Sequence, residues 1–284
     1  MVSFGRTNKC LYVLIKQDYV WKENAEDLCH KHDIKKVESH YCTYLQIVKG
    51  NKLWDKYKKI TDSTTVTNQK RLNLLTAAVD NGNEDAINDL LDAHLYGWFG
   101  LQINDPTGLT LAEKHADQDS EKAIGHLLDA YLYSLYGLKK NDPTGLTLAK
   151  HYADKGSEHA IYNLIDAYHR GWFGLQINDP EGLALAKHYA NKGSENAIAC
   201  LLNAYLSGGY GLTANDPEGL VLAKKYAEKG SERAIACLLN AYHWGWFGLE
   251  QNDQNRAEGL KLAETYADQG SEQAKIFVLE YGVN

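Results

Sequence analysis

The sequence has little of what marks membrane or secreted proteins. No apolar run approaches the roughly 20 residues that a transmembrane helix requires, so we expect no membrane insertion. The first residues lack a long apolar stretch followed by a small-residue cleavage site, so we expect no Sec-type signal peptide. The five cysteines are few and odd in number, which favours reduced thiols. We therefore expect the protein to act in the cytoplasm, or in a host cell after export by a non-Sec route.

Catalytic and cofactor motifs are also missing. The sequence has no P-loop, no G-x-G-x-x-G after a strand, no H-E-x-x-H and no G-x-S-x-G. One group of soft ligands suits zinc: Cys29, His30, His32, His40 and Cys42. It contains no C-x-x-C pair, and neighbouring ligands on a helix would point in different directions. We expect no metal, no cofactor and no catalytic residue; the alternative is an enzyme or enzyme regulator whose active segment lies in residues 1–67.

Charge is distributed unevenly along the chain. The net charge of −7 combines a balance of +4 in residues 1–67 with −11 in residues 68–284. Nucleic-acid binding depends on clustered Lys and Arg, so an acidic segment argues against a nucleic-acid partner. The change of sign, together with the polar stretch ITDSTTVTN, predicts a boundary near residue 67.

Proline is scarce, and its placement reveals a repeat. All four prolines lie in copies of one hexamer: NDPTGL at 104–109 and 141–146, then NDPEGL at 178–183 and 215–220. The copies are 37 residues apart, and a fifth form, NDQNRAEGL, occupies 252–260. A fixed period of this length is typical of a repeat array.

The hexamer reads as the start of a helix. In the third repeat, Asp179 can cap free N–H groups, and Pro180 suits the first helical position. Gly193 suits the left-handed residue that ends this helix. Ser157 is a good cap for a preceding helix, which Gly171 would end. Each repeat is therefore predicted to be a hairpin of a first and a second helix.

The pattern extends to about five or six repeats in residues 68–284. First helices are predicted to be capped at Asn83, Ser120, Ser157, Ser194, Ser231 and Ser271. Second helices are predicted over about 68–82, 106–118, 143–155, 180–192, 217–229 and 257–269. One hairpin cannot bury its apolar stripe alone, whereas stacked hairpins can. We expect an all-α fold, a right-handed α-solenoid of helical hairpins.

The repeat resembles the Sel1-like repeat, a relative of the tetratricopeptide repeat. The matching places are Leu201, Tyr205, Gly208, Gly211-Leu212, Asp216, Ala223, Tyr226-Ala227 and Gly230. The resemblance covers roughly residues 68–284, although Gly145, Gly182 and Gly219 stand where the family usually has Ala. It implies protein–protein interaction, in scaffolds, adaptors and factors that bacteria deliver into host cells.

A partner-binding face is expected on the first helices. Counting the cap as position 1, positions 3, 7, 10 and 14 lie opposite the apolar arc. Position 10 is Asp or Asn in five repeats, and Tyr, Arg and Trp at position 14 are favoured binding residues. The predicted partner-binding residues are Asp89, Asp92, Tyr96, His126, Asp129, Tyr133, Asn163, Asp166, Arg170, Asn203, Asn240 and Trp244.

That face leaves three interpretations open for position 10. It could line a concave groove that binds a protein or peptide with basic residues. It could instead bond the neighbouring repeat, or form a solvated surface. The loops of the GWFGL type have two interpretations as well: they close the turn between the two helices, or they form an aromatic ridge that faces a partner.

The two ends of the array are less regular. Residues 1–67 are interpreted as a cap segment, with a short hairpin at LYVLIKQDYVW and helices at ENAEDLCHKH and TYLQIVKGNKLWDKYKKI. The latter could pair with residues 68–82. At the other end, Phe277, Val278 and Tyr281 belong to a helix with no following partner. They form either a docking patch, for example for a homodimer, or the final layer of the core.

Overall fold

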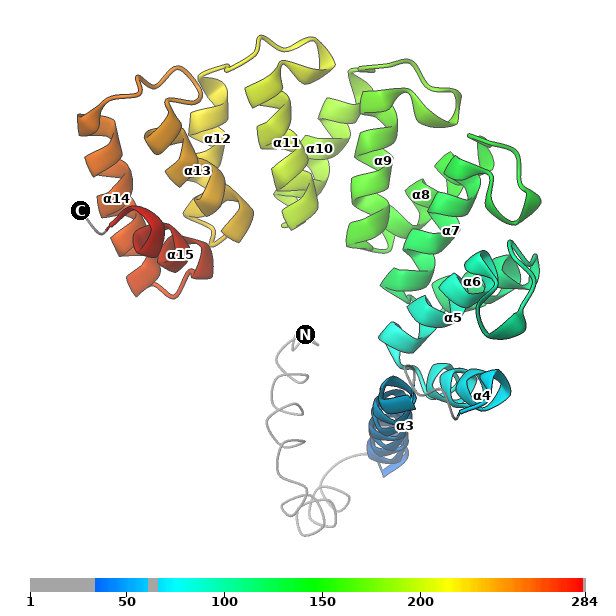
Figure 1. Cartoon of the computed structure of the whole chain (residues 1–284). Coiled ribbons are helices and arrows are strands. Elements are labelled where there is room, and N and C mark those ends of the chain that lie inside the picture. Colours follow the sequence, from blue (N-terminus) through cyan, green and yellow to red (C-terminus); the bar gives the residue numbers. More distant parts are fainter. Residues whose placement is uncertain (1–33, 61–65, 283–284) are drawn as a thin grey trace. The chain divides into compact units, whose positions relative to one another are not determined.

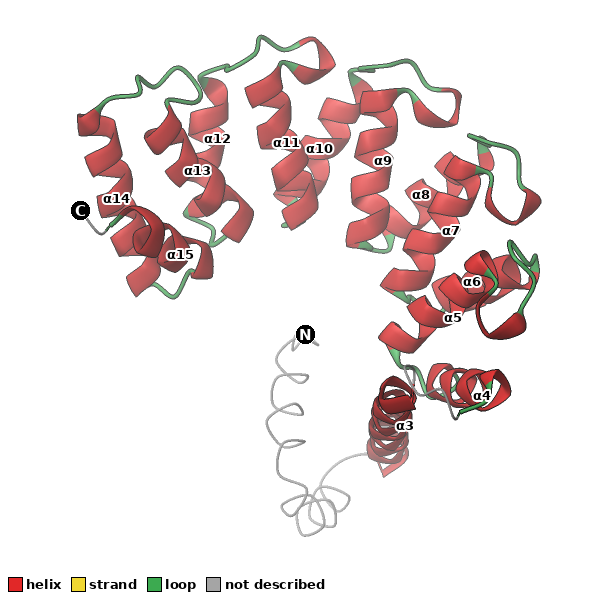
Figure 2. Cartoon of the chain, viewed as in Figure 1, coloured by secondary structure: helices red, strands yellow, loops and turns green. Residues whose placement is uncertain are grey.

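The computed structural model describes residues 34–60 and 66–282, and side chains from residue 46 onward within them. Helices make up its regular structure, and no β-strand occurs in this part of the chain (Figure 2). The chain divides into two compact units, Met1–Ile87 and Asn88–Asn284, and the division falls inside helix α5. The expected all-α array of helical hairpins is confirmed, whereas the functional boundary near residue 67 stays a prediction.

The first unit contains a helical pair. Helix α3 (Ile34–Ile60) packs against α4 (Asn68–Val79), as expected for the segment ending in KLWDKYKKI. Tyr57 and Leu75 are buried there. Asn83 caps the following helix by accepting from the N–H of Ala86 at 2.8 Å, and its amide donates to Asn51 at 2.8 Å. The predicted hairpin and the helix at 23–32 lie outside the described residues.

The second unit is the repeat array (Figure 1). Its first helices are α5 (Glu84–Tyr96), α7 (Glu121–Tyr133), α9 (Glu158–Arg170), α11 (Glu195–Ser207), α13 (Glu232–Trp244) and α15 (Glu272–Tyr281). Its second helices are α6 (Thr107–Ala116), α8 (Thr144–Asp154), α10 (Glu181–Asn191), α12 (Glu218–Ala227) and α14 (Asp253–Asp268). One-turn 3₁₀ helices follow four of the first helices: η1 (Trp98–Gly100), η2 (Leu135–Gly137), η3 (Trp172–Gly174) and η4 (Gly209–Gly211).

Local signals start and end the helices as the sequence predicted. Asp179 Oδ1 accepts from the N–H of Glu181 at 3.0 Å, with Pro180 in helical conformation between them. Ser194 Oγ accepts from the N–H of Ala197 at 3.1 Å. Gly193 ends its helix with a φ of +95°, and Asp119 takes the same left-handed region at 62°. These are backbone requirements that a short stretch of sequence can meet by itself.

One predicted boundary is wrong. The second helix of the last repeat was expected at about 257–269, but α14 begins at Asp253. Asn252 caps it, accepting from the N–H of Asn255 at 2.8 Å. The three inserted residues therefore add a turn to the helix instead of lengthening the loop.

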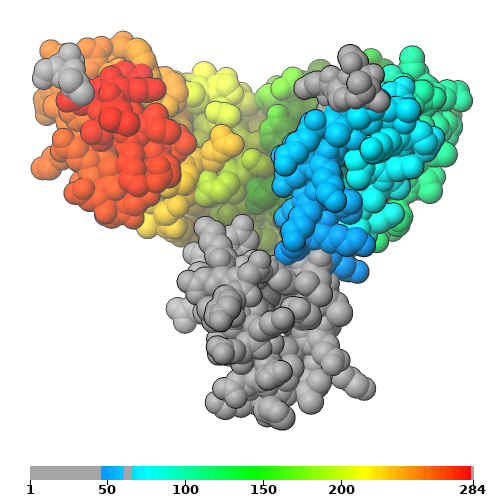
Figure 3. All heavy atoms as spheres, turned by 60° about the horizontal axis from the view of Figure 1, so that its bottom comes forward, coloured from blue at the N-terminus to red at the C-terminus, as the bar shows by residue number. Residues whose placement is uncertain are grey.

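Two kinds of contact curve the array. Each first helix from α7 to α13 packs directly against the next first helix. Successive second helices are instead bridged by long side chains, as where Tyr189 donates to Asp154 at 2.9 Å and Tyr226 donates to Asn191 at 3.1 Å. The closer spacing of the first helices places them on the concave side. Figure 3 shows side chains filling the space between successive hairpins.

The hexamer also joins each repeat to the next. Its Asn has a positive φ, as at Asn141 (61°), and accepts from the N–H of the aromatic residue in the following loop. The same pairing links Asn178 to Tyr210 at 3.3 Å. The aromatic rings pack on the hexamer glycines of the preceding repeat, Tyr136 on Gly108 and Phe173 on Gly145. The aromatic loops therefore connect neighbouring repeats, and they also pack on their own first helix, as Phe173 does on Ala167.

A second connection runs between the caps. Ser194 Oγ donates to Glu158 Oε2 of the preceding repeat at 2.8 Å. The same carboxylate accepts from the N–H of Asn196 at 3.1 Å. Equivalent bonds join Ser157 to Glu121 at 2.9 Å and Ser231 to Glu195 at 2.9 Å. The first helices α9, α11, α13 and α15 are thus each capped by their own Ser and held by the Glu of the repeat before it.

The last helix decides between the two interpretations of Phe277. This side chain is 7% exposed and packs against the rings of His243 and Tyr281. It belongs to the final layer of the core. The apolar side chains that α15 exposes are Ile276 and Leu279, so the homodimer contact suggested by the sequence would have to use them.

The glycine contact yields a stability prediction. Gly182→Ala should lower the free energy of unfolding by about 1–3 kcal/mol, the usual cost of overpacking a core. The added Cβ would lie 2.6 Å from Tyr168 Cβ and against the ring of Tyr210. Urea unfolding measures this, with Gly125→Ala as the matched control. At Gly125 the nearest atom, His159 Cδ2, is 3.4 Å away, so alanine should stabilise α7 by up to about 1 kcal/mol. Equal stabilities of the two variants would contradict the packing role.

The hexamer Asn yields a second prediction. Asn141→Gly keeps the positive φ but leaves the N–H of Phe173 without its acceptor, which should cost about 1–3 kcal/mol. Asn141→Ala should cost roughly a further 1 kcal/mol because alanine disfavours the left-handed region. Thermal unfolding of both variants checks this order. Alanine as stable as glycine would show that the backbone conformation is not a constraint here.

Candidate functional site

The first helices of the array carry all twelve residues predicted to bind a partner. They lie on α5, α7, α9, α11 and α13. Two pockets between neighbouring first helices gather eight of them. Asp92, Tyr96, His126, Asp129 and Tyr133 line one, and Asp166, Arg170 and Asn203 line the other. Asp89, Asn163, Asn240 and Trp244 lie on the same helices but line neither.

The first pocket lies between α5 and α7 and has a volume of about 590 Å³. We call it the acidic–aromatic pocket; the other lining residues are Leu95, Ile103, Asn104 and Leu135. Tyr96 and Tyr133 are 58% and 54% exposed, which is high for aromatic side chains of this size. The pocket thus combines two carboxylates with two accessible aromatic rings.

Burial dominates the electrostatics of this pocket. Desolvation raises the pKa of Asp92, although the charge of His126 and a hydrogen bond from Asn88 at 3.3 Å both oppose that rise. Desolvation also raises the pKa of Asp129. His126 Nε2 lies 3.5 Å from Asp92 Oδ1, and burial lowers the pKa of this imidazole. At neutral pH the imidazole is therefore mostly uncharged, and it does not neutralise the two carboxylates.

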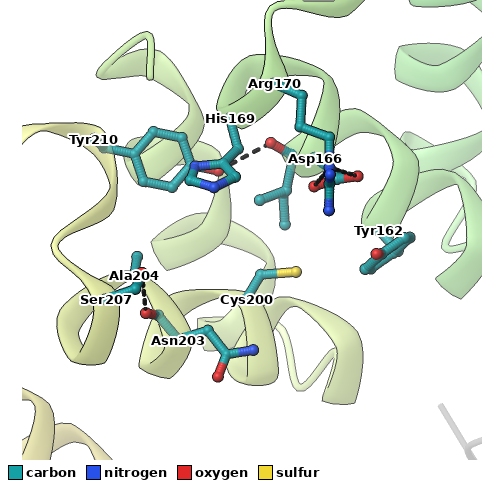
Figure 4. Close-up of a pocket in the computed structure, with 10 residues that line it drawn as sticks. Tyr162, Asp166, His169, Arg170, Cys200, Asn203, Ala204, Ser207 and Tyr210 are labelled. Carbon is teal, nitrogen blue, oxygen red and sulfur yellow. Dashed lines mark hydrogen bonds and ion pairs between the residues drawn. The ribbon is translucent and has the colours of Figure 1, made fainter. Parts of the chain in front are cut away.

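The second pocket lies between α9 and α11 and has a volume of about 190 Å³ (Figure 4). Arg170 Nε donates to both carboxylate oxygens of Asp166, at 2.9 and 2.8 Å. The Arg170 guanidinium also lies over the ring of Trp172, with its carbon 5.5 Å from the ring centroid. Ser207 Oγ donates to the carbonyl of Asn203 at 2.8 Å. The acidic group of this pocket is thus already neutralised by the chain itself.

Thiol chemistry is not favoured in this pocket. Burial raises the pKa of Cys200 to about 12, and Cys237 in the next repeat is affected in the same way. Both thiols are therefore protonated at neutral pH and are poor nucleophiles. Among the side chains that the structure describes, no three His, Cys, Asp or Glu residues could hold a metal ion together. The cluster of Cys and His residues from Cys29 to Cys42 is not among the residues whose side chains the structure describes.

The recurring Asp and Asn at position 10 do not form one uniform row. Asp166 was expected to be exposed, but it is only 9% exposed because Arg170 and helix α11 cover it. Asp92 contacts His126 of the next repeat, which is the inter-repeat role, whereas Asn203 is exposed to solvent. The inter-repeat interpretation therefore fits Asp92 and the solvated one fits Asn203, whereas Asp166 pairs with Arg170 of its own helix. Their role in binding a partner stays a prediction.

Some lining residues were not predicted. His169 and Tyr210 form one side of the second pocket, with ring centroids 5.3 Å apart. The sequence signal for this side of the pocket is Gly209, which stands where other repeats have Trp or Leu. A Cβ on Gly209 would come within 3.3 Å of His169 Cε1. Tyr162 on α9 is another accessible aromatic residue. Asn104 was read only as part of a helix start, although it also bonds the N–H of Tyr136.

The raised pKa of Asp129 gives a pH-dependent prediction. A carboxyl group whose folded pKa lies above its ordinary value destabilises the fold once it ionises. Among the described residues its carboxylate makes no hydrogen bond that would offset the desolvation. Asp129→Asn should therefore raise the melting temperature at pH 7. The gain should shrink as the pH falls through the raised pKa towards 3.8 and vanish below it.

The control for this measurement is Glu264→Gln on α14, which removes the same charge from an exposed site. This control should leave the melting temperature nearly unchanged, both at pH 7 and at the acidic pH where Asp129 is protonated. A melting temperature of Asp129→Asn equal to or below that of the intact chain at pH 7 would contradict the electrostatic account.

No helix of the described part of the chain combines the length and the apolar character needed to cross a membrane. No protein-family model matches the sequence, and no curated protein matches it either.

Solved structures provide the remaining comparison. A Sel1 repeat protein from Oxalobacter formigenes is 19% identical with a TM-score of 0.47, over 76% of this chain and 96% of that one. The protective antigen c5321 of uropathogenic Escherichia coli, which displays an SLR fold, is also 19% identical with a TM-score of 0.47. That match covers 87% of this chain but only 51% of the antigen. The immunity protein Pa5087 of Pseudomonas aeruginosa is 16% identical with a TM-score of 0.39, over 79% and 83%. The first two of these proteins are described by name as a Sel1 repeat protein and as a protein with an SLR fold.

Proposed function

We propose that the chain is a non-catalytic scaffold that binds a protein partner along the concave face of its first helices. The observation that carries this proposal is the repeated exposure of large aromatic side chains at position 14. Tyr96 and Tyr133, at position 14 of α5 and α7, line the acidic–aromatic pocket. Trp244, at the equivalent position of α13, is 45% exposed. Accessible aromatics next to polar groups are favoured anchors for partner proteins.

The form of the face suits an extended segment of the partner. Its binding positions recur once per repeat on parallel first helices, so contacts are spaced along the array rather than concentrated in one cavity. The polar group at position 10 changes from carboxylate in α5, α7 and α9 to amide in α11 and α13. A partner with basic residues towards one end therefore complements the face better than an acidic one.

A pull-down with matched variants tests the proposal. The concave variant carries Asp92→Lys and Asp129→Lys, and Asp166 is left intact because it already holds Arg170. The control variant carries Glu113→Lys and Glu264→Lys on the exposed surfaces of α6 and α14, which makes the same change of net charge. We expect the intact chain and the control to retain a protein that the concave variant loses by about tenfold or more, as for charge reversal in an interface.

Circular dichroism of each bait establishes that the variants are folded. Equal capture by all three baits would contradict binding at the concave face and would direct attention to residues 1–67, the alternative active segment. Two locations are proposed, the cytoplasm of the protein's own cell and, after non-Sec export, a host cell. Parallel bacterial and eukaryotic lysates distinguish them by the source of the retained protein.

A further inference from the structure

Comparison of equivalent positions in successive repeats shows how this chain accommodates a guanidinium group. In the third repeat, position 10 is Asp166 and position 14 is Arg170. The Arg170 Nε donates to both oxygens of that carboxylate, and its guanidinium lies over Trp172. A carboxylate below and an aromatic ring beside the group are the two partners that arginine prefers.

The first two repeats keep the carboxylate but lack the cation. Position 10 is Asp92 and Asp129, while position 14 is Tyr96 and Tyr133. Trp98 occupies the place of Trp172, and Tyr96 stacks on it with ring centroids 5.8 Å apart. The groups that bind Arg170 in the third repeat are therefore present around the acidic–aromatic pocket, without an arginine from the chain.

The charged groups around this pocket do not replace that arginine. His126 is the nearest base, with Nε2 3.5 Å from Asp92 Oδ1, but burial lowers its pKa, so it carries little charge at neutral pH. Lys122 is exposed one turn earlier on α7, and its charge acts on His126. His159 of the next repeat bonds Glu121 at 3.1 Å. Two partly buried carboxylates thus face an open space of about 590 Å³.

We propose that the acidic–aromatic pocket binds an arginine side chain of the partner protein, with the guanidinium between Asp92 and Asp129 and flanked by Tyr96 and Tyr133. This inference rests on the proposed function and names the chemistry of the partner. Arginine fits better than lysine for two reasons. Its planar fork can donate to two carboxylates at once, and its weaker hydration reduces the cost of entering a partly buried site.

Short peptides test the pocket without the natural partner. The probes are acetyl-Gly-Arg-Gly-amide and the same peptide with citrulline or lysine in place of arginine. Citrulline keeps the shape of the side chain and removes its charge. Ligand-observed NMR titration of the intact chain should give an affinity for the arginine peptide about tenfold or more above that for citrulline, as expected for a charge-assisted hydrogen bond. The lysine peptide should bind more weakly than the arginine peptide.

Two protein variants place the binding at the pocket. Asp129→Asn should weaken binding of the arginine peptide about tenfold or more, because it removes one of the two acceptors. The matched control is Glu264→Gln, which removes one carboxylate charge from an exposed site on α14 outside both pockets. It should leave peptide binding unchanged. A melting curve for each variant establishes that a loss of binding is not a loss of fold.

Several results would overturn the inference. These are equal binding of arginine and citrulline peptides, equal binding of arginine and lysine peptides, no binding by any peptide, or full binding by Asp129→Asn. The scaffold proposal fails separately. If the concave variant alone loses its partner in the pull-down while the peptides bind equally, the scaffold stands and the arginine pocket is wrong. If the peptides behave as expected but all baits capture equally, the pocket stands and the scaffold proposal is wrong.

Discussion

The array depends on the contact between an aromatic ring of one repeat and a glycine of the repeat before it. Tyr136, Phe173, Tyr210 and Phe247 pack on Gly108, Gly145, Gly182 and Gly219. The ring can reach the glycine only because its own residue has a positive φ and its N–H is held by the hexamer Asn. A Cβ at the glycine position of the second helix would push the two repeats apart, so the spacing between repeats depends on this contact. The hexamer is therefore a joint between repeats as well as a helix start.

Packing and the proposed recognition use different positions of the same repeat. The residues that join repeats hardly vary: Ser caps, the Glu after them, the hexamer Asn and Gly, and the aromatic residue of the loop. The residues at positions 10 and 14 of the first helices vary from repeat to repeat. They form a carboxylate with tyrosine in α5 and α7, a carboxylate with arginine in α9, and amides in α11 and α13. The concave face consequently changes its chemistry along the array while the backbone geometry stays the same, which is how a solenoid acquires specificity.

Sequence reasoning succeeded where the physics is local. Ser caps, Asp–Pro starts and glycine ends each satisfy backbone groups within a few residues, so their positions could be predicted. It failed at α14, where inserted residues extended the helix because Asn252 offered an earlier cap. It did not find that the aromatic loops also join neighbouring repeats, because the glycine that Phe173 covers lies in another repeat. All twelve candidate residues lie on the predicted helices, but the burial of Asp166 under Arg170 depends on rotamers and on helix α11.

By itself, the sequence determined the period, the helical hairpins and the set of side chains that recur on the first helices. These follow from short-range rules of capping, conformation and helical spacing. The tertiary structure decided which of those side chains meet. It brought Asp92 and Asp129 together with Tyr96 and Tyr133 in one pocket, and it placed Arg170 on Asp166 in another. The reason is that a pocket between two repeats depends on the distance and angle between helices, which are set by packing across the repeat boundary.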